Sequence, residues 1–185
     1  MPGIPALAQP LHDGRVSLRF AVERDIPEIL IAYQDDPQMH LRLGEDRPPS
    51  GAELGRRTER SEDDLASGRL VRFTIVLDGT DDCRGQITVH TIDWEHRRAE
   101  LGIWVAPRLR RRGIATAALR LVAGWLFGVC GLQRLTVLTE PDNQGMLGAA
   151  QAAGYVHEGV LRAYALERRA RVDCAILSLL PSDLA

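Results

Sequence analysis

A basic turn between an apolar strand and an alanine-rich helix carries the clearest chemical signal in this sequence. Four arginines occupy the six positions from Arg108 to Gly113, and Pro107 separates them from the apolar run Glu100–Val105. The first turn of a helix has unpaired N–H groups and a partial positive charge, so it attracts anions. Small residues at Gly113 and Ala115 let a phosphate approach those amides, and arginines add charge and forked donors. The turn is a candidate phosphate site, but a solvated basic helix start would show the same six residues.

Composition restricts the class of protein. The chain has 185 residues, of which 45% are hydrophobic and 26% charged, as is typical of one globular domain with a substantial core. Its net charge of -2 argues against a general nucleic-acid binder. No apolar run reaches the roughly 18 residues that a membrane span needs. All 23 basic residues are arginines, which excludes lysine nucleophiles and Schiff-base chemistry.

The N-terminal segment and the cysteines indicate domain boundaries and compartment. Residues 1–14 contain three prolines and no basic stretch of a signal peptide, so we expect a flexible arm before a single domain at 15–185. Cys83, Cys130 and Cys174 are far apart and have no metal-ligand spacing. This odd number of dispersed cysteines favours structural thiols in a reducing cytoplasm, and no metal site is expected.

The hydrophobic pattern predicts the elements that position these residues. Alternating runs between turn residues predict strands, and apolar residues at helical spacing predict helices. Strands are expected at 15–22, 70–77, 84–94, 100–105, 132–139, 155–165 and 171–180, and helices at 26–36, 50–68, 114–129 and 142–153, with a short irregular helix within 37–49. Asp25 is the expected N-cap of the first helix. A mixed sheet covered by helices is the compact arrangement of this order.

Four segments of the chain match one family pattern. They are Leu18-Arg19 with Asp25, the run Ala99–Val105, the spacing Arg110-x-x-Gly113-x-Ala115, and Asn143 followed by Ala153-Gly154-Tyr155 and Glu158–Arg162. Together they resemble the GNAT superfamily of acyl-CoA N-acyltransferases, and more narrowly its RimJ/RimL-type branch. The resemblance implies an α/β GNAT fold with a mixed, mostly antiparallel, seven-stranded sheet and about four helices. Its fourth and fifth strands are expected to splay apart.

The resemblance implies an acyl-CoA cosubstrate, with acetyl-CoA as the leading donor and another short acyl group as the alternative. The pantothenate arm would pair with the backbone edge of the fourth strand, and the pyrophosphate would lie on the basic turn. The implied cofactor-binding residues are Ile103, Trp104, Val105, Arg110, Arg111, Arg112, Gly113, Ile114, Ala115, Thr116 and Asn143. Asn143 also has the simpler interpretation of an ordinary helix-start residue.

Direct attack of an amine on a thioester needs a base for the amine and stabilisation of the leaving thiolate. Glu100 is the candidate base, acting through a water, and its structural alternative is an ion pair with Arg97 or Arg98. Tyr164 is the candidate acid for the thiolate or a wall of the acceptor pocket, and its structural alternative is packing.

Two positions depart from the branch pattern. Met146 stands where relatives often carry a serine beside the thiol, and Ala165 stands where some carry a glutamate proposed as the base. Methionine gives the thiolate no useful hydrogen bond, and alanine cannot take a proton. Ribosomal N-terminal acetylation is therefore in question, and His40 and His90 are further candidate bases.

The acceptor and the assembly stay open at this point. Acids in the loop 34–50, namely Asp35, Asp36, Glu45 and Asp46, could attract a cationic amine or could be solvated. The acceptor is a protein N-terminal amine or a small molecule such as an antibiotic, polyamine or amino acid. A non-catalytic CoA-binding module is the alternative from another class. The expected partners are acyl-CoA and the amine, with no nucleic acid and no membrane, and a homodimer is left open.

Overall fold

A mixed sheet with helices on both faces forms the structure, and the computed structural model describes residues 3–167 and 170–184. The strands are β1 (Leu11–His12), β2 (Val16–Phe20), β3 (Val71–Leu77), β4 (Gly85–Asp93), β5 (Arg98–Val105), β6 (Arg134–Thr139), β7 (Val156–Glu167) and β8 (Ala170–Leu179). The α-helices are α1 (Ile26–Asp35), α2 (Met39–Arg42), α3 (Gly51–Glu59), α4 (Ser61–Ala66), α5 (Ile114–Gly128) and α6 (Gln144–Ala152). Short 3-10 helices occupy Glu23–Asp25, Pro107–Leu109 and Pro181–Leu184.

The sheet order is β1-β2-β3-β4-β5-β6-β8-β7, and only the β5–β6 pair is parallel among the described strands. The expected mixed, mostly antiparallel sheet is therefore confirmed. The expected number of seven strands is wrong, because residues 3–167 and 170–184 form eight. The additional strand is β1, in which Leu11 pairs with Leu18 and His12 with Ser17. Upstream of β1, the Ile4 N–H donates to the Leu65 carbonyl oxygen at 2.8 Å.

The described residues also form six α-helices where about four were expected. The single helix expected at 50–68 is two helices, α3 and α4, which meet at Arg60. The Ser61 hydroxyl donates to the Thr58 carbonyl oxygen at 2.6 Å, so a side chain competes there for a backbone acceptor. The expected irregular helix is α2. No described helix is long and apolar enough to cross a membrane. The connection between the last two expected strands, 155–165 and 171–180, includes residues 168 and 169, which lie outside the described residues.

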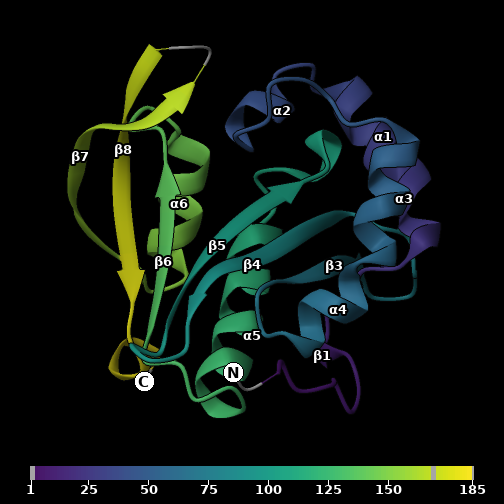
Figure 1. The fold of residues 1–185 in the computed structure, drawn as a ribbon, viewed down its shortest axis with the longest axis horizontal. Coiled ribbons are helices and arrows are strands. Elements are labelled where there is room, and N and C mark those ends of the chain that lie inside the picture. Colours follow the sequence, from purple (N-terminus) through teal and green to yellow (C-terminus); the bar gives the residue numbers. More distant parts are fainter. Residues whose placement is uncertain (1–2, 168–169, 185) are drawn as a thin grey trace.

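Different helices cover the two faces of the sheet. Side chains alternate along β5, so Leu101 and Ile103 join the main core together with α5. Trp104 points to the other face and packs with a smaller cluster from α1, α2 and α3, including Ile29 and Leu54. Figure 1 shows α1, α2 and α3 gathered beside β3, β4 and β5, while α6 lies beside β6 and β8. Strand β5 therefore lies between two separate packing environments.

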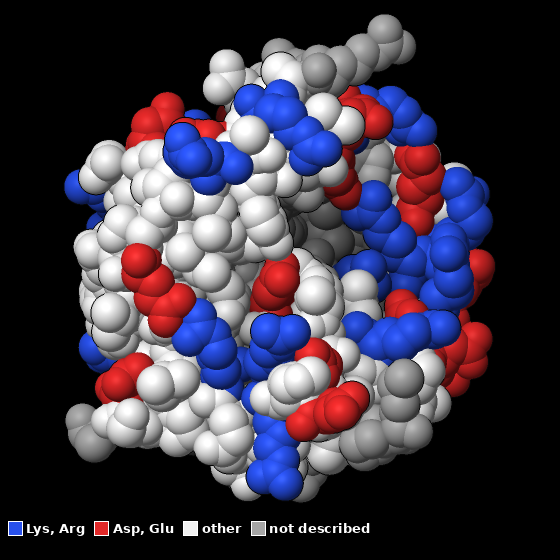
Figure 2. All heavy atoms as spheres, turned by 60° about the vertical axis from the view of Figure 1, so that its left-hand side comes forward, with Lys and Arg blue, Asp and Glu red and all other residues white. Residues whose placement is uncertain are grey.

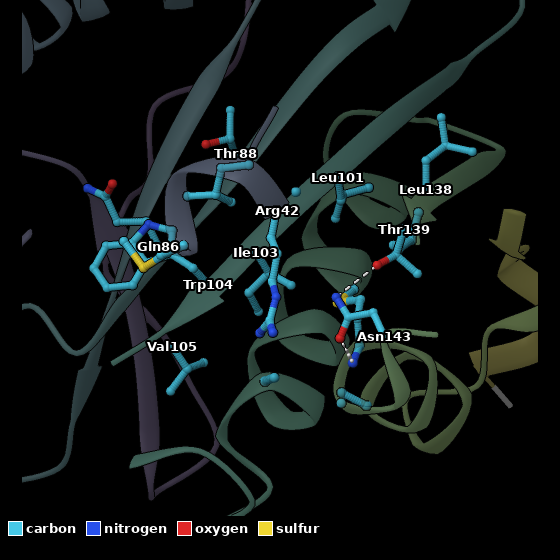
Figure 3. A pocket seen from close by; sticks show the side chains of 18 of the residues that line it. Arg42, Gln86, Thr88, Leu101, Ile103, Trp104, Val105, Leu138, Thr139 and Asn143 are labelled. Carbon is cyan, nitrogen blue, oxygen red and sulfur yellow. Dashed lines mark hydrogen bonds between the residues drawn. The ribbon is translucent and has the colours of Figure 1, made fainter. Parts of the chain in front are cut away.

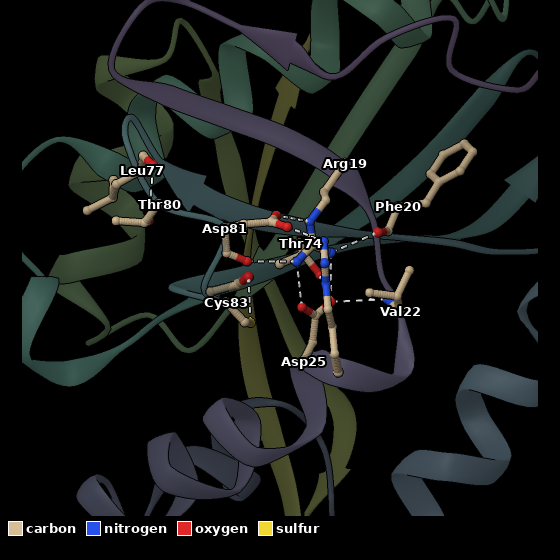
Figure 4. A network of polar contacts seen from close by, with 11 residues as sticks. Arg19, Phe20, Val22, Asp25, Thr74, Leu77, Thr80, Asp81 and Cys83 are labelled. Atoms are coloured by element: carbon tan, nitrogen blue, oxygen red, sulfur yellow. Dashed lines mark hydrogen bonds and ion pairs between the residues drawn. The ribbon is translucent and has the colours of Figure 1, made fainter.

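The sequence predicted Asp25 as the N-cap of the first helix. Asp25 does occupy the N-cap position of α1, but its side chain makes no capping hydrogen bond to the helix. Its carboxylate, only 2% exposed, accepts from Arg19 Nη2 at 2.7 Å, from Thr74 Oγ1 at 2.6 Å and from the Val22 N–H at 3.0 Å. Figure 4 shows this network, which also includes Asp81. A buried carboxylate is stable only when its oxygens are satisfied, and three donors do so here. The network ties the start of α1 to β2 and β3.

The expected splay of β5 and β6 is confirmed. The two strands pair only at their first residues, Arg98 with Arg134, Ala99 with Leu135 and Glu100 with Thr136. Beyond that point β5 continues beside β4 alone, and Figure 1 shows β6 diverging from it. The backbone edge of β5 from Leu101 to Val105 is thus left without a neighbouring strand on that side.

Candidate active site

A cleft of about 1350 Å³ opens where β5 and β6 diverge. The sheet side is lined by residues of β3, β4 and β5, and the opposite side by residues of β6, α6 and β7. Residues of α1, α2 and α3 line a third side. Since the two halves of the sheet separate only past Glu100, the cleft begins at that residue and continues to the start of α5.

The open edge of β5 forms one wall of the cleft. Ile103, Trp104 and Val105 all line it, and Figure 3 shows them on the side of the pocket opposite Asn143. An unpaired strand edge offers N–H and C=O groups to any extended chain that lies along it. The geometry therefore suits an elongated ligand with amide groups.

The turn after β5 is built from backbone in the left-handed region. Arg111 has φ 62° and Gly113 has φ 75°, and Gly113 is the N-cap of α5. A Cβ on Gly113 would meet only Arg15 Nη1, at 3.8 Å, so the backbone conformation and not crowding favours glycine there. Left-handed residues before a helix turn successive N–H groups toward one concavity, which suits an anion.

The arginines of the turn differ in whether they line the cleft. The side chain of Arg110 stabilises the turn, because its Nε donates to the Val105 carbonyl oxygen at 3.1 Å and its Nη1 lies 2.7 Å from Asp36 Oδ2. Arg110 and Arg111 line the cleft together with Gly113, Ile114, Ala115 and Thr116. Arg112 does not line it; its carbonyl oxygen instead accepts a hydrogen bond from Arg15.

Asn143 lines the cleft and is also the N-cap of α6. Its Oδ1 accepts from the Met146 N–H at 3.2 Å, and its Nδ2 donates to Thr139 Oγ1 at 3.0 Å. The simpler interpretation of Asn143 as a helix-start residue is therefore confirmed, and a second role toward a ligand stays a prediction. Figure 3 shows both hydrogen bonds at the cleft wall.

Glu100 and His90 face each other across β4 and β5. The two residues are directly paired in the register, and His90 Nδ1 lies 4.0 Å from Glu100 Oε2. Glu100 is 28% exposed and lines the cleft. Burial lowers the pKa of His90, although the Glu100 carboxylate opposes this shift. His90 is therefore mainly neutral near pH 7 and can accept a proton.

The arginine alternative for Glu100 is not realised in the described residues. Arg98 pairs with Asp93 instead, with Nη2 at 3.1 Å from Oδ2, and Arg97 forms no ion pair with Glu100. His40, the other histidine candidate, lies on α2 and does not line the cleft.

Tyr164 reaches the cleft through an irregularity in β7. The register with β8 shifts between Leu161 and Ala165, and Ala163 has φ 52°. The Ala163 N–H donates to Asp173 Oδ1 at 2.7 Å, which holds the bulge. Because a bulge breaks the alternation of side chains, Tyr164 and Ala165 both line the cleft. Tyr164 is 50% exposed, so its hydroxyl is accessible to a ligand.

Sequence reasoning missed the polar residues on the sheet floor of the cleft. These are Arg72 from β3 and Gln86 and Thr88 from β4, and Arg42 and Arg57 reach the cleft from α2 and α3. A signal was present, since polar residues alternate with apolar ones at Arg72 and Thr74 and again at Gln86, Thr88 and His90. That alternation marks one face of each strand, but it does not say whether the face meets solvent, a helix or a cleft.

Comparison with known proteins decides the family. A family model described as an acetyltransferase (GNAT) domain matches residues 15–156. The chain belongs to the GNAT acetyltransferase family. The resemblance seen in the sequence is thereby confirmed, and this GNAT chain is an N-acetyltransferase-type transferase.

Relatives of this GNAT chain share its length and its fold. The uncharacterized N-acetyltransferase p20 of Bacillus licheniformis is 26% identical over 176 residues, which cover 95% of this chain and 98% of p20. RimJ of Mycobacterium smegmatis, solved in complex with CoA-disulfide, has a TM-score of 0.81 at 24% identity, covering 95% of this chain and 88% of RimJ. Spermidine N-acetyltransferase of Vibrio cholerae, solved with CoA and spermine, has a TM-score of 0.78 at 19% identity, covering 93% and 99%. At these identities, the two solved structures support the shared fold alone.

Proposed function

We propose that this GNAT protein transfers an acetyl group from acetyl-CoA to a primary amine. The observation that carries the proposal is the open edge of β5, which leads directly into the left-handed turn and the first amides of α5. The pantothenate arm would lie along Ile103–Val105 as an added strand, with Asn143 on the opposite wall. The pyrophosphate would accept hydrogen bonds from amides between Arg111 and Thr116.

The side chains around the start of the splay support direct transfer. The amine nitrogen attacks the thioester carbonyl carbon, the C–S bond breaks, and an amide and the CoA thiolate result. Glu100, through a water, accepts the proton that the nitrogen loses, and His90 can pass this proton on. The Tyr164 hydroxyl, on the opposite side of the cleft, donates a proton to the thiolate sulfur.

A charge placed in the first turn of α5 tests the cosubstrate site. Ala115 lines the cleft, and an acidic residue near a helix N-terminus favours the helix. We therefore expect Ala115→Glu to keep the fold but to weaken acetyl-CoA binding by about 100-fold, because the carboxylate repels the pyrophosphate. Isothermal titration calorimetry measures the affinity.

Ala115→Gln is the matched control, since glutamine has the size of glutamate without its charge. It should bind acetyl-CoA more tightly than Ala115→Glu by at least about 10-fold. Equal affinities of both variants and the unchanged protein would contradict the phosphate site. Release of free thiol from acetyl-CoA with a panel of amines tests transfer separately. Tight binding without release for any amine would favour a non-catalytic CoA-binding module.

A further inference from the structure

Arg72 brings a guanidinium without a partner into the cleft. Its backbone pairs with Thr88, which in turn pairs with Gly102, so the three residues form one row across β3, β4 and β5. All three line the cleft, and Gly102 leaves space in front of β5 because it has no side chain. The Arg72 side chain forms no hydrogen bond or ion pair with any residue in 3–167 or 170–184.

The surroundings of Arg72 favour an anionic ligand. Arg72 is half-buried, and desolvation together with nearby Arg57 and Arg60 lowers its pKa, although Asp64 and Glu45 partly oppose this shift. A guanidinium has five N–H donors, and removing donors from water without replacing their hydrogen bonds costs free energy. An oxyanion in the cleft would satisfy these donors and offset the repulsion from the other two arginines.

A second arginine approaches the cleft from α2. Arg42 lines the cleft, and Figure 3 shows its side chain extending into it toward the level of Ile103 and Trp104. It also forms no hydrogen bond or ion pair with the part of the chain that the structure describes. Arg42 and Arg72 come from different walls of the same cleft, so one ligand can contact both.

Three of the four loop acids that could attract a cationic amine are paired with arginines, and the fourth, Asp46, does not line the cleft. The pairs are Asp35–Arg108 at 3.3 Å, Asp36–Arg110 at 2.7 Å and Glu45–Arg57 at 2.7 Å, and Glu45 also accepts from the Tyr33 hydroxyl. The surface in Figure 2 is hollowed beside a group of basic side chains. The contacts of these acids therefore do not support the alternative in which they attract a cationic amine.

We propose that the acceptor is a small amine that also carries an oxyanion, a carboxylate or a phosphate, and that Arg72 and Arg42 bind this group. The proposal rests on the amine acetylation proposed above and specifies its substrate class. The paired residues His90 and Glu100 form the next row on the same face of the sheet, two residues along each strand from Thr88 and Gly102. Two residues along a strand span about 7 Å. An amine and an oxyanion separated by a few bonds would span this distance.

This oxyanion site is separate from the turn proposed for the CoA pyrophosphate. The turn follows the carboxyl end of β5, at Arg110–Thr116, whereas the row of Arg72 crosses β5 at Gly102, near the start of the splay. Trp104 lies between the two positions along β5 and lines the cleft. Arg72 is thus placed for the acceptor and not for the CoA phosphates.

Matched acceptors test the proposal by thiol release from acetyl-CoA. We expect kcat/KM for 4-aminobutanoate or 2-aminoethyl phosphate to exceed that for butylamine or spermidine by at least about 10-fold. Comparing 4-aminobutanoate with 2-aminoethyl phosphate shows whether the site prefers a carboxylate or a phosphate. A neutral tripeptide amide, with a free N-terminus and no C-terminal carboxylate, tests a protein acceptor. Higher activity on spermidine, on butylamine or on the tripeptide would overturn the proposal.

Variants then assign the effect to Arg72. Arg72→Gln should lower kcat/KM for the oxyanion-bearing amines by about 10- to 100-fold, while activity on butylamine and the affinity for acetyl-CoA stay unchanged. Arg72→Lys should recover part of the loss. Arg60→Gln is the matched control, because it removes a nearby positive charge that does not line the cleft. An equal loss in Arg60→Gln and Arg72→Gln would reduce the effect to overall charge and contradict direct binding.

A binding experiment separates this proposal from the proposed catalysis. Calorimetry of 4-aminobutanoate and butylamine on the CoA-saturated protein needs no turnover. Selective binding of 4-aminobutanoate that Arg72→Gln abolishes would support the oxyanion site even if no amine were acetylated. Turnover of amines with no dependence on an oxyanion would support the acetyl transfer and overturn the oxyanion site.

Discussion

Glu100 has the surroundings that a proton acceptor needs. It lies at the point where β6 leaves β5, so its carboxylate faces the cleft and remains partly accessible to water. Arg98 is bound to Asp93, which keeps the nearest arginine on the strand from occupying the carboxylate oxygens that must accept the proton. Across the pair of strands, His90 is mainly neutral and adds a second acceptor. The role proposed for Glu100 thus depends on its neighbours as much as on its own chemistry.

Glu100→Gln keeps the size of the side chain and removes the proton acceptor. We expect kcat to fall by about 100-fold, with the acidic limb of its pH profile lost and acetyl-CoA affinity unchanged. Thiol release measured across pH checks this. His90→Gln is the companion variant: if it abolishes the acidic limb while Glu100→Gln retains it, the base is His90.

Strands β6, β7 and β8 are joined by one group of polar residues that do not line the cleft. Arg134 Nη1 of β6 donates to Glu158 Oε1 of β7 at 2.9 Å, and Ser178 Oγ of β8 donates to the same oxygen at 2.6 Å. These contacts lower the pKa of Glu158 to about 2. Since the ordinary value is 4.5, the folded protein binds fewer protons there than the unfolded chain at intermediate pH. The resulting stabilisation is complete above about pH 4.5 and is lost as the pH falls toward 2.

Glu158→Gln should therefore destabilise the protein at neutral pH and not in acid. We expect the free energy of unfolding to fall by about 1 kcal/mol at pH 7, a modest value because both partners are partly exposed. The difference from the unchanged protein should shrink as the pH is lowered from 4.5 toward 2. Urea unfolding at several pH values measures it. Glu59→Gln, an exposed change on α3, should show no such pH dependence.

The whole sheet consists of two halves with few connections between them. Strands β1 to β5 form one half and β6 to β8 the other, and three residue pairs join them at the start of β5 and β6. Helix α5 contacts β1, β2 and β5 on one side and α6 on the other, so it also bridges the halves. A ligand in the cleft would contact both halves and close the unpaired edge of β5.

Binding of acetyl-CoA should therefore protect particular backbone amides from hydrogen exchange. We expect slower exchange within Leu101–Val105 of β5 and at the first turn of α5, because the β5 N–H groups that face away from β4 and the free N–H groups of the helix gain acceptors. Amides of β3, which are paired on both sides within the sheet, should not change. Exchange measured by mass spectrometry with and without acetyl-CoA checks this. Uniform protection, or protection confined to β3, would contradict binding along β5.

Much of this protein follows from local sequence. Pro107 ends β5, Gly113 starts α5 in a left-handed conformation, and alternating residues place Glu100 and Leu101 on opposite faces, because each feature depends on neighbours within a few positions. The resemblance to the GNAT family added the prediction that the strands now labelled β5 and β6 splay apart. The role of Asp25 could not be predicted in this way, since its carboxylate bonds to Thr74, 49 positions away.

The acceptor side of the cleft depended on contacts between distant segments. From the sequence, Asp36 and Glu45 were available acids, but folding brings Arg110 and Arg57 to them, while Arg72 forms no ion pair or side-chain hydrogen bond with the described residues. Charge in a site is the sum over groups within a few ångströms, and that set is defined only when strands and helices from different parts of the chain pack together. The residues of the cofactor turn are contiguous and could be predicted. The residues that would select the acceptor come from β3, α2 and α3, and their balance of charge exists only in the folded molecule.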